Sequence, residues 1–356
     1  MKLPAGSGML GAALGVVAVG AAVGLSAERY AVGRIRLRPD PEAREPFFAL
    51  PADRVRRVVA DDGVPLHVEE VGPSDAPLTV VFLHGYVQEV AGWHYQRLAL
   101  AQDNPGRLVF YDHRSHGRSG RGRPESATID QLGRDLLTVL DALVPHGQVV
   151  LVGHSMGGMT IMALADARPE LFGSRIVGVA LLSTSTGKLA ELTFGLPSVL
   201  RPLSKLTLPW LSRGVRKRPE PFETSRRLGS DLAFVFARYA GFGDREVSPA
   251  LVQLVEQMAA NTPVDVIAEF HETFTTHDKL EATGVLSQVE TLILVGSKDL
   301  VTPEDHSREM AESLPRASLV VVEGAGHMVQ LERAPLVTLQ LRALVGRAVR
   351  SAQRTA

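Results

Sequence analysis

The stretch "LVGHSMGGMT", residues 151–160, places Ser155 between two glycines, Gly153 and Gly157, and a third glycine, Gly158, follows. An apolar run precedes the serine and a helix-forming run follows it, so the serine occupies a sharp turn from a strand to a helix. Such a turn lifts the hydroxyl above the edge of the sheet, and side chains at the first two glycine positions would collide there. We interpret the third glycine as the one that lets the helix pack closely on the preceding strand. The pattern predicts a nucleophilic serine; the alternative is a structural turn that happens to contain a serine.

A serine hydroxyl attacks a carbonyl when a base takes its proton and an acid holds that base in the right tautomer. Asp299 follows the strand-like run "TLILVG", and His327 lies in a glycine-marked loop after "SLVVVEG". Both follow predicted strands, whose carboxyl ends form the usual ligand-binding edge of an open α/β sheet. The loop after "GVALLS" contains no Asp or Glu nearby, which disfavours an acid there. These positions predict a catalytic triad of Ser155, Asp299 and His327.

The attacked carbonyl also needs N–H groups that bind its developing negative charge. Met156, directly after the serine, and Tyr86, in the loop after "VVFLHG", are expected to supply them. The alternative for that loop is an ordinary turn at the end of a strand. His154 is expected to support the turn, with its side chain directed away from the nucleophile.

The stretch "YDHRSHGRSG", residues 111–120, contains two histidines and two glycines. It lacks the spacing of a phosphate-binding loop and that of a zinc protease helix, so we interpret it as a rigid loop near the site. No metal and no cofactor is expected. His271 and His277 lie in a helical stretch and are expected to face solvent or to line the pocket.

The composition excludes several classes of protein. The chain has 356 residues and no cysteine, and its 38 Lys and Arg residues nearly balance its 39 Asp and Glu residues. Without cysteine there are no disulfides, thiolate nucleophiles or cysteine-type zinc sites. The charge balance implies no broad basic surface for nucleic acid. The partner expected is a small-molecule substrate, and nothing in the composition indicates an oligomeric state.

Strand-like and helix-like runs alternate along most of the chain, which predicts an α/β fold with a mainly parallel sheet flanked by helices. The alternation stops in one long stretch, where prolines, basic residues and helical patterns predict a helical cap. The predicted segments are an N-terminal anchor with a basic flank (1–38), a linker (39–54), the first part of the core (55–187), the cap (188–287) and the second part of the core (288–356).

Residues 8–27, "GMLGAALGVVAVGAAVGLSA", contain no charge and no proline. The run is as long as the ~20 residues that cross a bilayer and longer than the apolar core of a signal peptide. We therefore expect a retained membrane anchor; the alternative is cleavage near Ala27 and export. Four arginines between residues 29 and 38 follow the run, and only Lys2 precedes it, so the positive-inside rule favours a cytoplasmic catalytic domain.

Five stretches together resemble the α/β-hydrolase superfamily in its lid-bearing form. They are "FLHGY", "YDHRSHGRSG", "GHSMGG", "LVGSKDLVTP" and "GAGHMVQLERAP", and they follow the family's order. The resemblance implies that Ser155 is the nucleophile, Asp299 the acid and His327 the base, with Tyr86 and Met156 supplying the oxyanion N–H groups. It also implies that the predicted helical insertion is the cap.

The type of nucleophile limits the classes of reaction that the chain is expected to catalyse. Serine rather than aspartate at position 155 argues against epoxide hydrolases and haloalkane dehalogenases, which share the outline. We expect hydrolysis of carboxylic esters, of the carboxylesterase or lipase type, through an acyl-enzyme. The apolar cap stretch 192–211 beside a membrane anchor favours apolar or lipid-like substrates, although packing of the cap on the core explains the same composition. The alternatives are a thioesterase, a cofactor-free perhydrolase of the haloperoxidase type, and a non-catalytic binding member of the fold.

Overall fold

The computed structural model describes residues 32–36, 38–103, 106–189 and 230–355. The expected anchor at 8–27 and the apolar cap stretch at 192–211 lie outside the described residues. In the described part of the chain, no helix is both long enough and apolar enough to cross a membrane.

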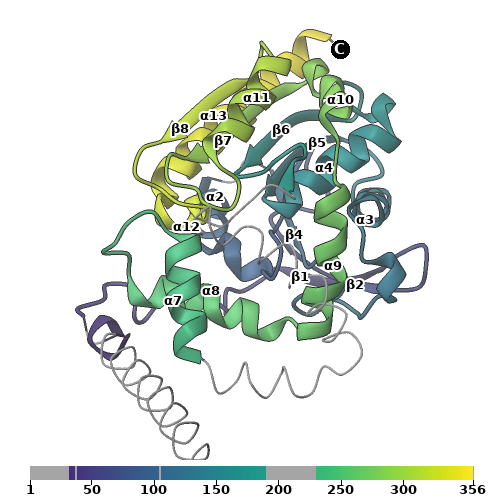
Figure 1. Ribbon diagram of the computed structural model, residues 1–356. Helices are drawn as coiled ribbons and strands as arrows, with labels where there is room; N and C mark the ends of the chain where they lie inside the picture. The colour runs from purple at the N-terminus through teal and green to yellow at the C-terminus, as the bar shows by residue number, and fades with distance from the viewer. Residues whose placement is uncertain (1–31, 37, 104–105, 190–229, 356) are drawn as a thin grey trace, which may run out of the picture.

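Eight strands form one sheet in the order β1-β2-β4-β3-β5-β6-β7-β8. They are β1 (Arg54–Val59), β2 (Pro65–Val71), β3 (Leu78–Leu83), β4 (Arg107–Tyr111), β5 (Gln148–His154), β6 (Ile176–Leu182), β7 (Glu290–Gly296) and β8 (Ser318–Val322). β1 and β2 form an antiparallel hairpin with Gly63 in its turn at a φ of 88°, and β2 pairs antiparallel with β4. The neighbours from β4 to β8 are all parallel (Figure 1). The mainly parallel sheet predicted from the alternating pattern is confirmed.

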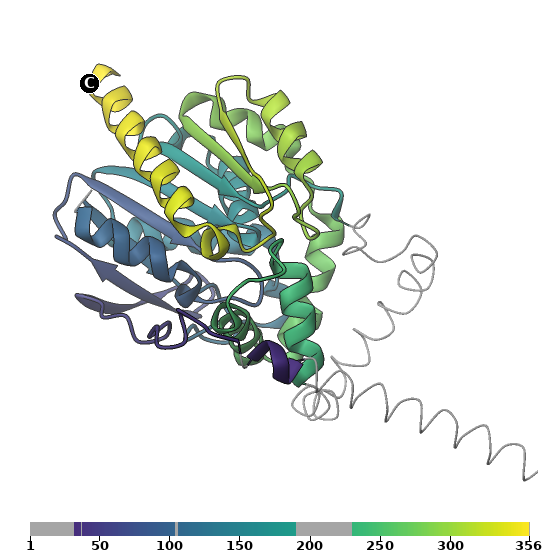
Figure 2. The ribbon, with the colours of Figure 1, turned by 90° about the vertical axis from the view of Figure 1, so that its left-hand side faces the viewer.

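Helices cover both faces of this sheet (Figure 2). One face carries α3 (Ile129–Leu143), α4 (Met156–Ala167) and α11 (Glu304–Ser313), and the other carries α2 (His94–Asp103) and α13 (Ala334–Thr355). Within β3, Val81 and Leu83 enter the first core, whereas Val80 and Phe82 enter the second. Successive side chains of a strand point to opposite faces, so a strand that is covered on both faces is apolar throughout.

Helix α3 shows how the local sequence produces an element. Leu132, Leu136 and Leu140 recur every four residues, and all three are buried against the sheet. Thr128 caps the amino end, because its hydroxyl accepts a hydrogen bond from the Gln131 N–H (3.1 Å). The apolar repeat and the cap together set where this helix begins and which face it buries.

A helical insertion separates β6 from β7, inside the segment predicted to form the cap. Its described helices are α7 (Ser230–Gly241), α8 (Pro249–Asn261), α9 (Val264–Thr276), α10 (Leu280–Thr283) and the 3-10 helix η6 (Gly284–Gln288). The Asn261 amide donates a hydrogen bond to Glu89, in the loop after β3 (2.8 Å), and Arg121, in the loop after β4, pairs with Glu269 (2.7 Å). α8 and α9 therefore lie over the carboxyl ends of the central strands (Figure 1).

Short helices in the described part of the core are η1 (Val90–Trp93), η2 (Pro124–Ser126), η3 (Pro169–Leu171) and α12 (Val329–Glu332). A helical turn at 32–36 packs on the cap, since Val32 lies in one cluster with Phe234. The segment 39–54, expected as a linker from its proline and charge content, contacts both the cap and α2. Asp40 accepts a hydrogen bond from the Ala250 N–H at the start of α8 (2.7 Å), and the ring of Phe47 lies 4.7 Å from that of His94.

Candidate functional site

Ser155 occupies the turn between β5 and α4 in a conformation that few residues other than glycine adopt. Its φ is 52° and its ψ is −117°, and its side chain is almost completely buried. A Cβ on Gly153 would lie 2.5 Å from the Gly157 carbonyl carbon, and a Cβ on Gly157 would lie 2.2 Å from the Leu83 carbonyl oxygen. Both positions therefore need glycine, as the sequence predicts. A strained backbone of this kind costs about 1–3 kcal/mol and is concentrated at functional sites.

The third glycine has a different role from the one predicted. A Cβ on Gly158 would lie 2.7 Å from the side chain of Thr184, in the loop after β6. The Thr184 hydroxyl in turn donates a hydrogen bond to the Ser155 carbonyl (2.7 Å). Gly158 thus lets α4 approach the neighbouring loop, whereas close packing on the preceding strand depends on Gly153 and Gly157.

The start of α4 and the loop after β3 meet beside Ser155, because the Gly157 backbone packs against the Leu83 carbonyl. Met156 is the first residue of α4, and the N–H groups of a first helical turn have no partner inside the helix and carry partial positive charge. The Tyr86 hydroxyl donates a hydrogen bond to the Ile267 carbonyl of α9, so the side chain is turned towards the cap. Burial raises the pKa of this phenol above its ordinary value. That Met156 and Tyr86 supply oxyanion N–H groups stays a prediction.

Asp299 and His327 are in direct contact at the ends of β7 and β8. His327 Nδ1 lies 2.9 Å from Asp299 Oδ2 and 3.1 Å from Oδ1, and both side chains are buried. The N–H groups of Val301 and Thr302 donate to Asp299 Oδ1 (both 2.8 Å), and the Thr302 hydroxyl donates to Oδ2 (3.0 Å). Burial opposes the charge of Asp299, but the His327 charge and these hydrogen bonds outweigh it and lower the pKa of Asp299. The carboxylate therefore holds the Nδ1–H tautomer of His327 and leaves Nε2 as the free basic nitrogen.

His154 connects the three loops of the site. Its Nε2 donates to the His327 carbonyl (2.9 Å), and its Nδ1 accepts a hydrogen bond from the Gln88 amide (3.3 Å). The rings of His154 and His327 are 4.9 Å apart, which brings His327 to the turn that carries Ser155. Burial, together with the His327 charge, lowers the pKa of His154 to about 3, so the ring is neutral and both hydrogen bonds are satisfied. His154 therefore supports the turn by hydrogen-bonding to the loops after β3 and β8.

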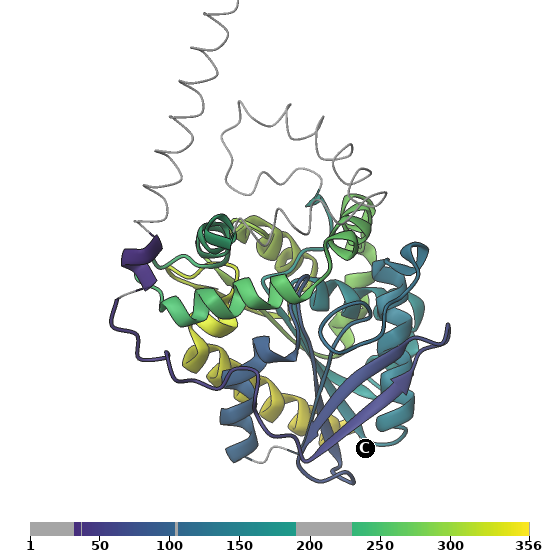
Figure 3. The same ribbon diagram turned by 90° about the horizontal axis from the view of Figure 1, so that it is seen from below.

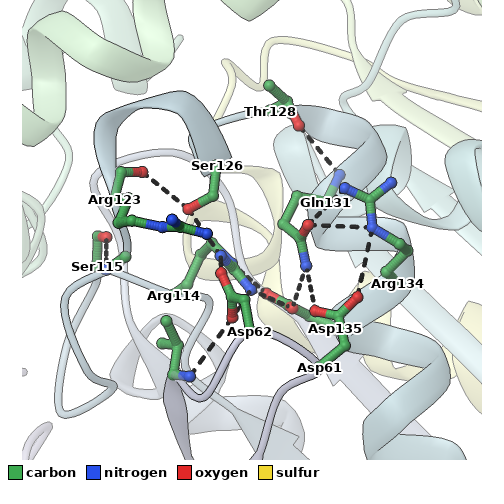
Figure 4. A network of polar contacts seen from close by, with 12 residues as sticks. Asp61, Asp62, Arg114, Ser115, Arg123, Ser126, Thr128, Gln131, Arg134 and Asp135 are labelled. Carbon is green, nitrogen blue, oxygen red and sulfur yellow. Dashed lines mark hydrogen bonds and ion pairs between the residues drawn. The ribbon is translucent and has the colours of Figure 1, made fainter.

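The loop after β4 is held by a buried arginine (Figure 4). Arg114 makes two hydrogen bonds of 2.6 Å to Asp135 of α3, and others to Asp62 (2.7 and 3.0 Å) and to Ser126 (2.8 Å). Burial opposes the charge of Arg114, but the two carboxylates hold its pKa above the ordinary value. This network explains the rigid loop expected at residues 111–120.

The histidines of this loop are neutral. Burial lowers the pKa of His113 to about 3 and that of His116 to about 4. The His113 ring donates from Nε2 to the His84 carbonyl (3.1 Å), and the His113 backbone N–H donates to His84 Nε2 (2.9 Å). In the described ranges, no group of three or more His, Asp or Glu side chains is arranged to hold a metal ion. These rings support the loop after β3.

Replacing Arg114 with alanine is expected to lower the free energy of unfolding by about 3–5 kcal/mol, because Asp135 would remain as a buried charge without its main partner. Arg123 lies in the same loop with an exposed side chain, so Arg123→Ala should change stability by less than about 0.5 kcal/mol. Guanidinium denaturation of both variants measures the difference. Equal losses in the two variants would contradict a structural role for the Arg114 network.

Several residues of the site escaped prediction. Thr302 has a local signal, since Asp299 binds the N–H groups two and three residues further along, as short Asp turns do. Gln88 and Glu332 have no such signal. Glu332 accepts hydrogen bonds from Gly326, next to His327 (2.7 Å), and from Asp244 in the cap (2.6 Å).

The two histidines of the insertion have different surroundings. His277 is buried and hydrogen-bonds to the Ser185 carbonyl (3.1 Å), which excludes the first of the two expected positions, facing solvent. His271 is only partly buried on α9.

Comparisons with known proteins agree with the observed fold. A family model described as the alpha/beta hydrolase fold matches residues 79–334. The chain is 27% identical over 276 residues to the "dihydrolipoyllysine-residue acetyltransferase component of acetoin cleaving system" of Pseudomonas putida, covering 77% of this chain and 64% of that protein. It thus spans less than two thirds of that relative's length. It is 28% identical over 273 residues to "3-oxoadipate enol-lactonase 1" of Acinetobacter baylyi, covering 76% of this chain and 89% of the other.

Solved structures show the same fold. A thermophilic esterase from Thermogutta terrifontis superposes with a TM-score of 0.66 at 23% identity, covering 83% of this chain and 99% of the other. At this level of identity the likeness concerns the fold alone.

Proposed function

The chain belongs to the family of the alpha/beta hydrolase fold, and from that premise we propose that it is a serine hydrolase that cleaves carboxylic esters through an acyl-enzyme. One observation carries the proposal. The buried Asp299–His327 pair, with 2.9 Å between Oδ2 and Nδ1, packs against the strained turn that carries Ser155. An imidazole fixed by a carboxylate beside a serine is the arrangement that activates a hydroxyl.

In the proposed mechanism, Ser155 Oγ attacks the ester carbonyl while His327 Nε2 takes its proton. The N–H groups of Met156 and Tyr86 bind the negative charge that develops on the carbonyl oxygen. His327 then gives the proton to the leaving alcohol, which leaves an acyl group on Ser155. A water molecule, deprotonated by the same histidine, attacks the acyl group and releases the acid.

We propose that the acyl group is apolar or lipid-like. An apolar cluster joins Met156 and Met159 of α4 to Val266 and Phe270 of α9, with Tyr86 packed against it. An acyl chain attached to Ser155 would extend from the start of α4 towards this cluster under the cap. The names of two proteins similar to this chain, an enol-lactonase and an esterase, describe cleavage of ester bonds in those proteins.

We also propose that residues 8–27 anchor the chain in a membrane, with the catalytic body on the cytoplasmic side. The length and uniform apolar character of the run support an anchor, and the arginines after it support the orientation.

A fluorophosphonate probe tests the proposed serine chemistry. The native chain is expected to become labelled at one residue, Ser155, because the probe phosphonylates only a serine whose proton is removed by a nearby base. Intact-mass measurement and peptide mapping identify the site. A native chain that stays unlabelled would favour a non-catalytic binding protein with this fold.

A series of p-nitrophenyl esters tests the proposed substrate class. Burial of each additional CH₂ contributes about 0.8 kcal/mol, so kcat/KM should rise by up to about fourfold per CH₂ from acetate until the chain outgrows the site. A sharp preference for acetate would contradict an apolar acyl group. Faster turnover of thioesters, or halide oxidation that requires peroxide and a short-chain acid, would favour the thioesterase or the perhydrolase instead.

A further inference from the structure

Helix α7 carries large apolar side chains on its outer face. Val235, Phe236 and Tyr239 are 42%, 60% and 40% exposed, and their spacing places them on one side of the helix. Phe234 and Ala237, on the opposite side, are buried in the cap. Large apolar side chains therefore lie on both the buried and the exposed side of α7, which is not expected where the outer side faces only water.

Arginines surround this exposed face. The Arg245 guanidinium lies 5.8 Å from the centre of the Tyr239 ring. The Arg238 guanidinium donates a hydrogen bond to the Arg245 carbonyl. Arg38 hydrogen-bonds through its N–H to Ile35, which packs on the same cluster as Phe234. Burial, followed by the charges of Arg245 and Arg38, lowers the pKa of Arg238. Arginine side chains next to exposed aromatic rings favour an anionic, partly apolar partner.

Two acidic residues near α7 pair with arginines outside this face. Asp244 pairs with Arg333 (3.6 Å), and Glu256 pairs with Arg36 (3.7 Å). Asp244 also acts on Arg238, and the exposed Glu246 follows Arg245, so the three arginines of the face outnumber the two carboxylates beside them.

The start of the described chain lies beside the same helix (Figure 1 and Figure 3). Val32 packs in one cluster with Phe234, and the Arg36 guanidinium lies 4.9 Å from the centre of the Phe234 ring. The apolar run 8–27 ends five residues before Val32. Five residues span at most about 18 Å when fully extended, so an anchor that ends at the bilayer surface keeps Val32, which packs on α7, within that distance of the bilayer.

We propose that the outer face of α7 is a membrane-contact surface, formed by Val235, Phe236 and Tyr239 with Arg38, Arg238 and Arg245, that binds an anionic phospholipid bilayer. The apolar side chains enter the boundary between headgroups and acyl chains, and the arginines contact lipid phosphates. The proposal rests on the membrane anchor of the proposed function and not on the ester chemistry. It places the cap, and the apolar cluster beneath it, next to the source of lipid-like substrates.

The lack of cysteine makes this surface directly measurable. We would label Phe236→Cys of the full chain with an environment-sensitive fluorophore and reconstitute it in vesicles of phosphatidylcholine with phosphatidylglycerol. Val59→Cys is the matched control, because Val59 is 61% exposed on β1, next to the hairpin turn whose Asp61 accepts a hydrogen bond from Gln131 of α3. The β1–β2 hairpin and α7 lie on opposite sides of the molecule in Figure 1. We expect a blue shift and quenching by lipid-attached quenchers at position 236 and neither at position 59. A label at 236 that stays as water-exposed as the one at 59, in a chain that floats with the vesicles, would overturn the proposal.

Removal of charge tests the lipid headgroup contact. In the labelled chain, Arg38→Gln with Arg245→Gln should lower the ratio of docked to undocked protein about 25-fold on anionic vesicles, since each arginine contributes about fivefold. An unchanged ratio would overturn the proposed contact between the arginines and lipid phosphates.

A blue shift that needs no vesicles and grows with protein concentration would assign the face to a second copy of the chain. Flotation of the native chain tests the anchor separately, and if the chain does not float the anchor and this surface both fail. Turnover of a soluble p-nitrophenyl ester tests the hydrolase independently of either.

Discussion

Ser155→Ala is expected to lower kcat for ester hydrolysis about 10⁶-fold, to near the rate that the remaining groups provide. The substitution removes the nucleophile and leaves His327 with no hydroxyl to deprotonate, so no acyl-enzyme forms. The alanine keeps the Cβ and the backbone of the turn, whose φ of 52° is set by the packing of Gly153 and Gly157. Circular dichroism and the denaturation midpoint should therefore remain close to those of the native chain, while steady-state and burst kinetics with a p-nitrophenyl ester measure the loss.

Ser183 provides the matched control. It is a buried serine at the carboxyl end of β6, next to β5 in the sheet, and it also has a positive φ, of 44°. Ser183→Ala is expected to retain kcat within a few fold and to remain labelled by the fluorophosphonate. If Ser155→Ala kept more than about a hundredth of the native kcat, the catalytic nucleophile would have to be another residue.

The prediction of the turn succeeds because its causes are local. Three glycines around one serine, between an apolar run and a helical run, have few structural explanations. The observed close contacts of Gly153 and Gly157 show why the glycines are needed. Helix α3 could be predicted for the same kind of reason, since its leucines repeat at helical spacing and Thr128 caps it.

Contacts between distant segments leave no such pattern. His154 hydrogen-bonds to residues 66 and 173 positions away, and neither Gln88 nor His327 carries a local sign of that bond. The prediction for Gly158 is wrong for a similar reason. The side chain that requires a glycine there is Thr184, which lies in the loop after β6 and is distant in the sequence.

The segment 39–54 shows how composition misleads about packing. Proline and charge are typical of a spacer, yet Asp40 bonds to the start of α8, Phe47 packs against His94, and Glu45 hydrogen-bonds to the same histidine (3.1 Å). Contacts made by individual side chains fix the segment, and an average over its composition does not show them. The neighbours of the segment 39–54 depend on where the folded cap lies, and the sequence of the segment alone does not show this.

Asp299→Asn is expected to lower kcat about 10⁴-fold while the chain stays folded. Asp299 Oδ1 accepts N–H bonds from Val301 and Thr302, so the amide oxygen of asparagine would take this position and the amide NH₂ would face His327. An NH₂ there donates to Nδ1 and stabilises the tautomer with its proton on Nε2. That tautomer has no free basic nitrogen towards Ser155. Asp305→Asn, an exposed carboxylate on α11, is the control and should leave kcat unchanged.

The pH dependence of stability separates this explanation from simple unfolding. The pKa of Asp299 is lowered in the folded chain, so its stabilising charge is fully present above the unfolded pKa of about 4 and is lost as the pH falls through the folded value. Asparagine has no such titration, and the free energy of unfolding of Asp299→Asn should therefore fall less steeply than that of the native chain below pH 4. Guanidinium denaturation at several pH values measures both slopes. A variant with near-native kcat, or with the native acid slope, would mean that another carboxylate fixes His327.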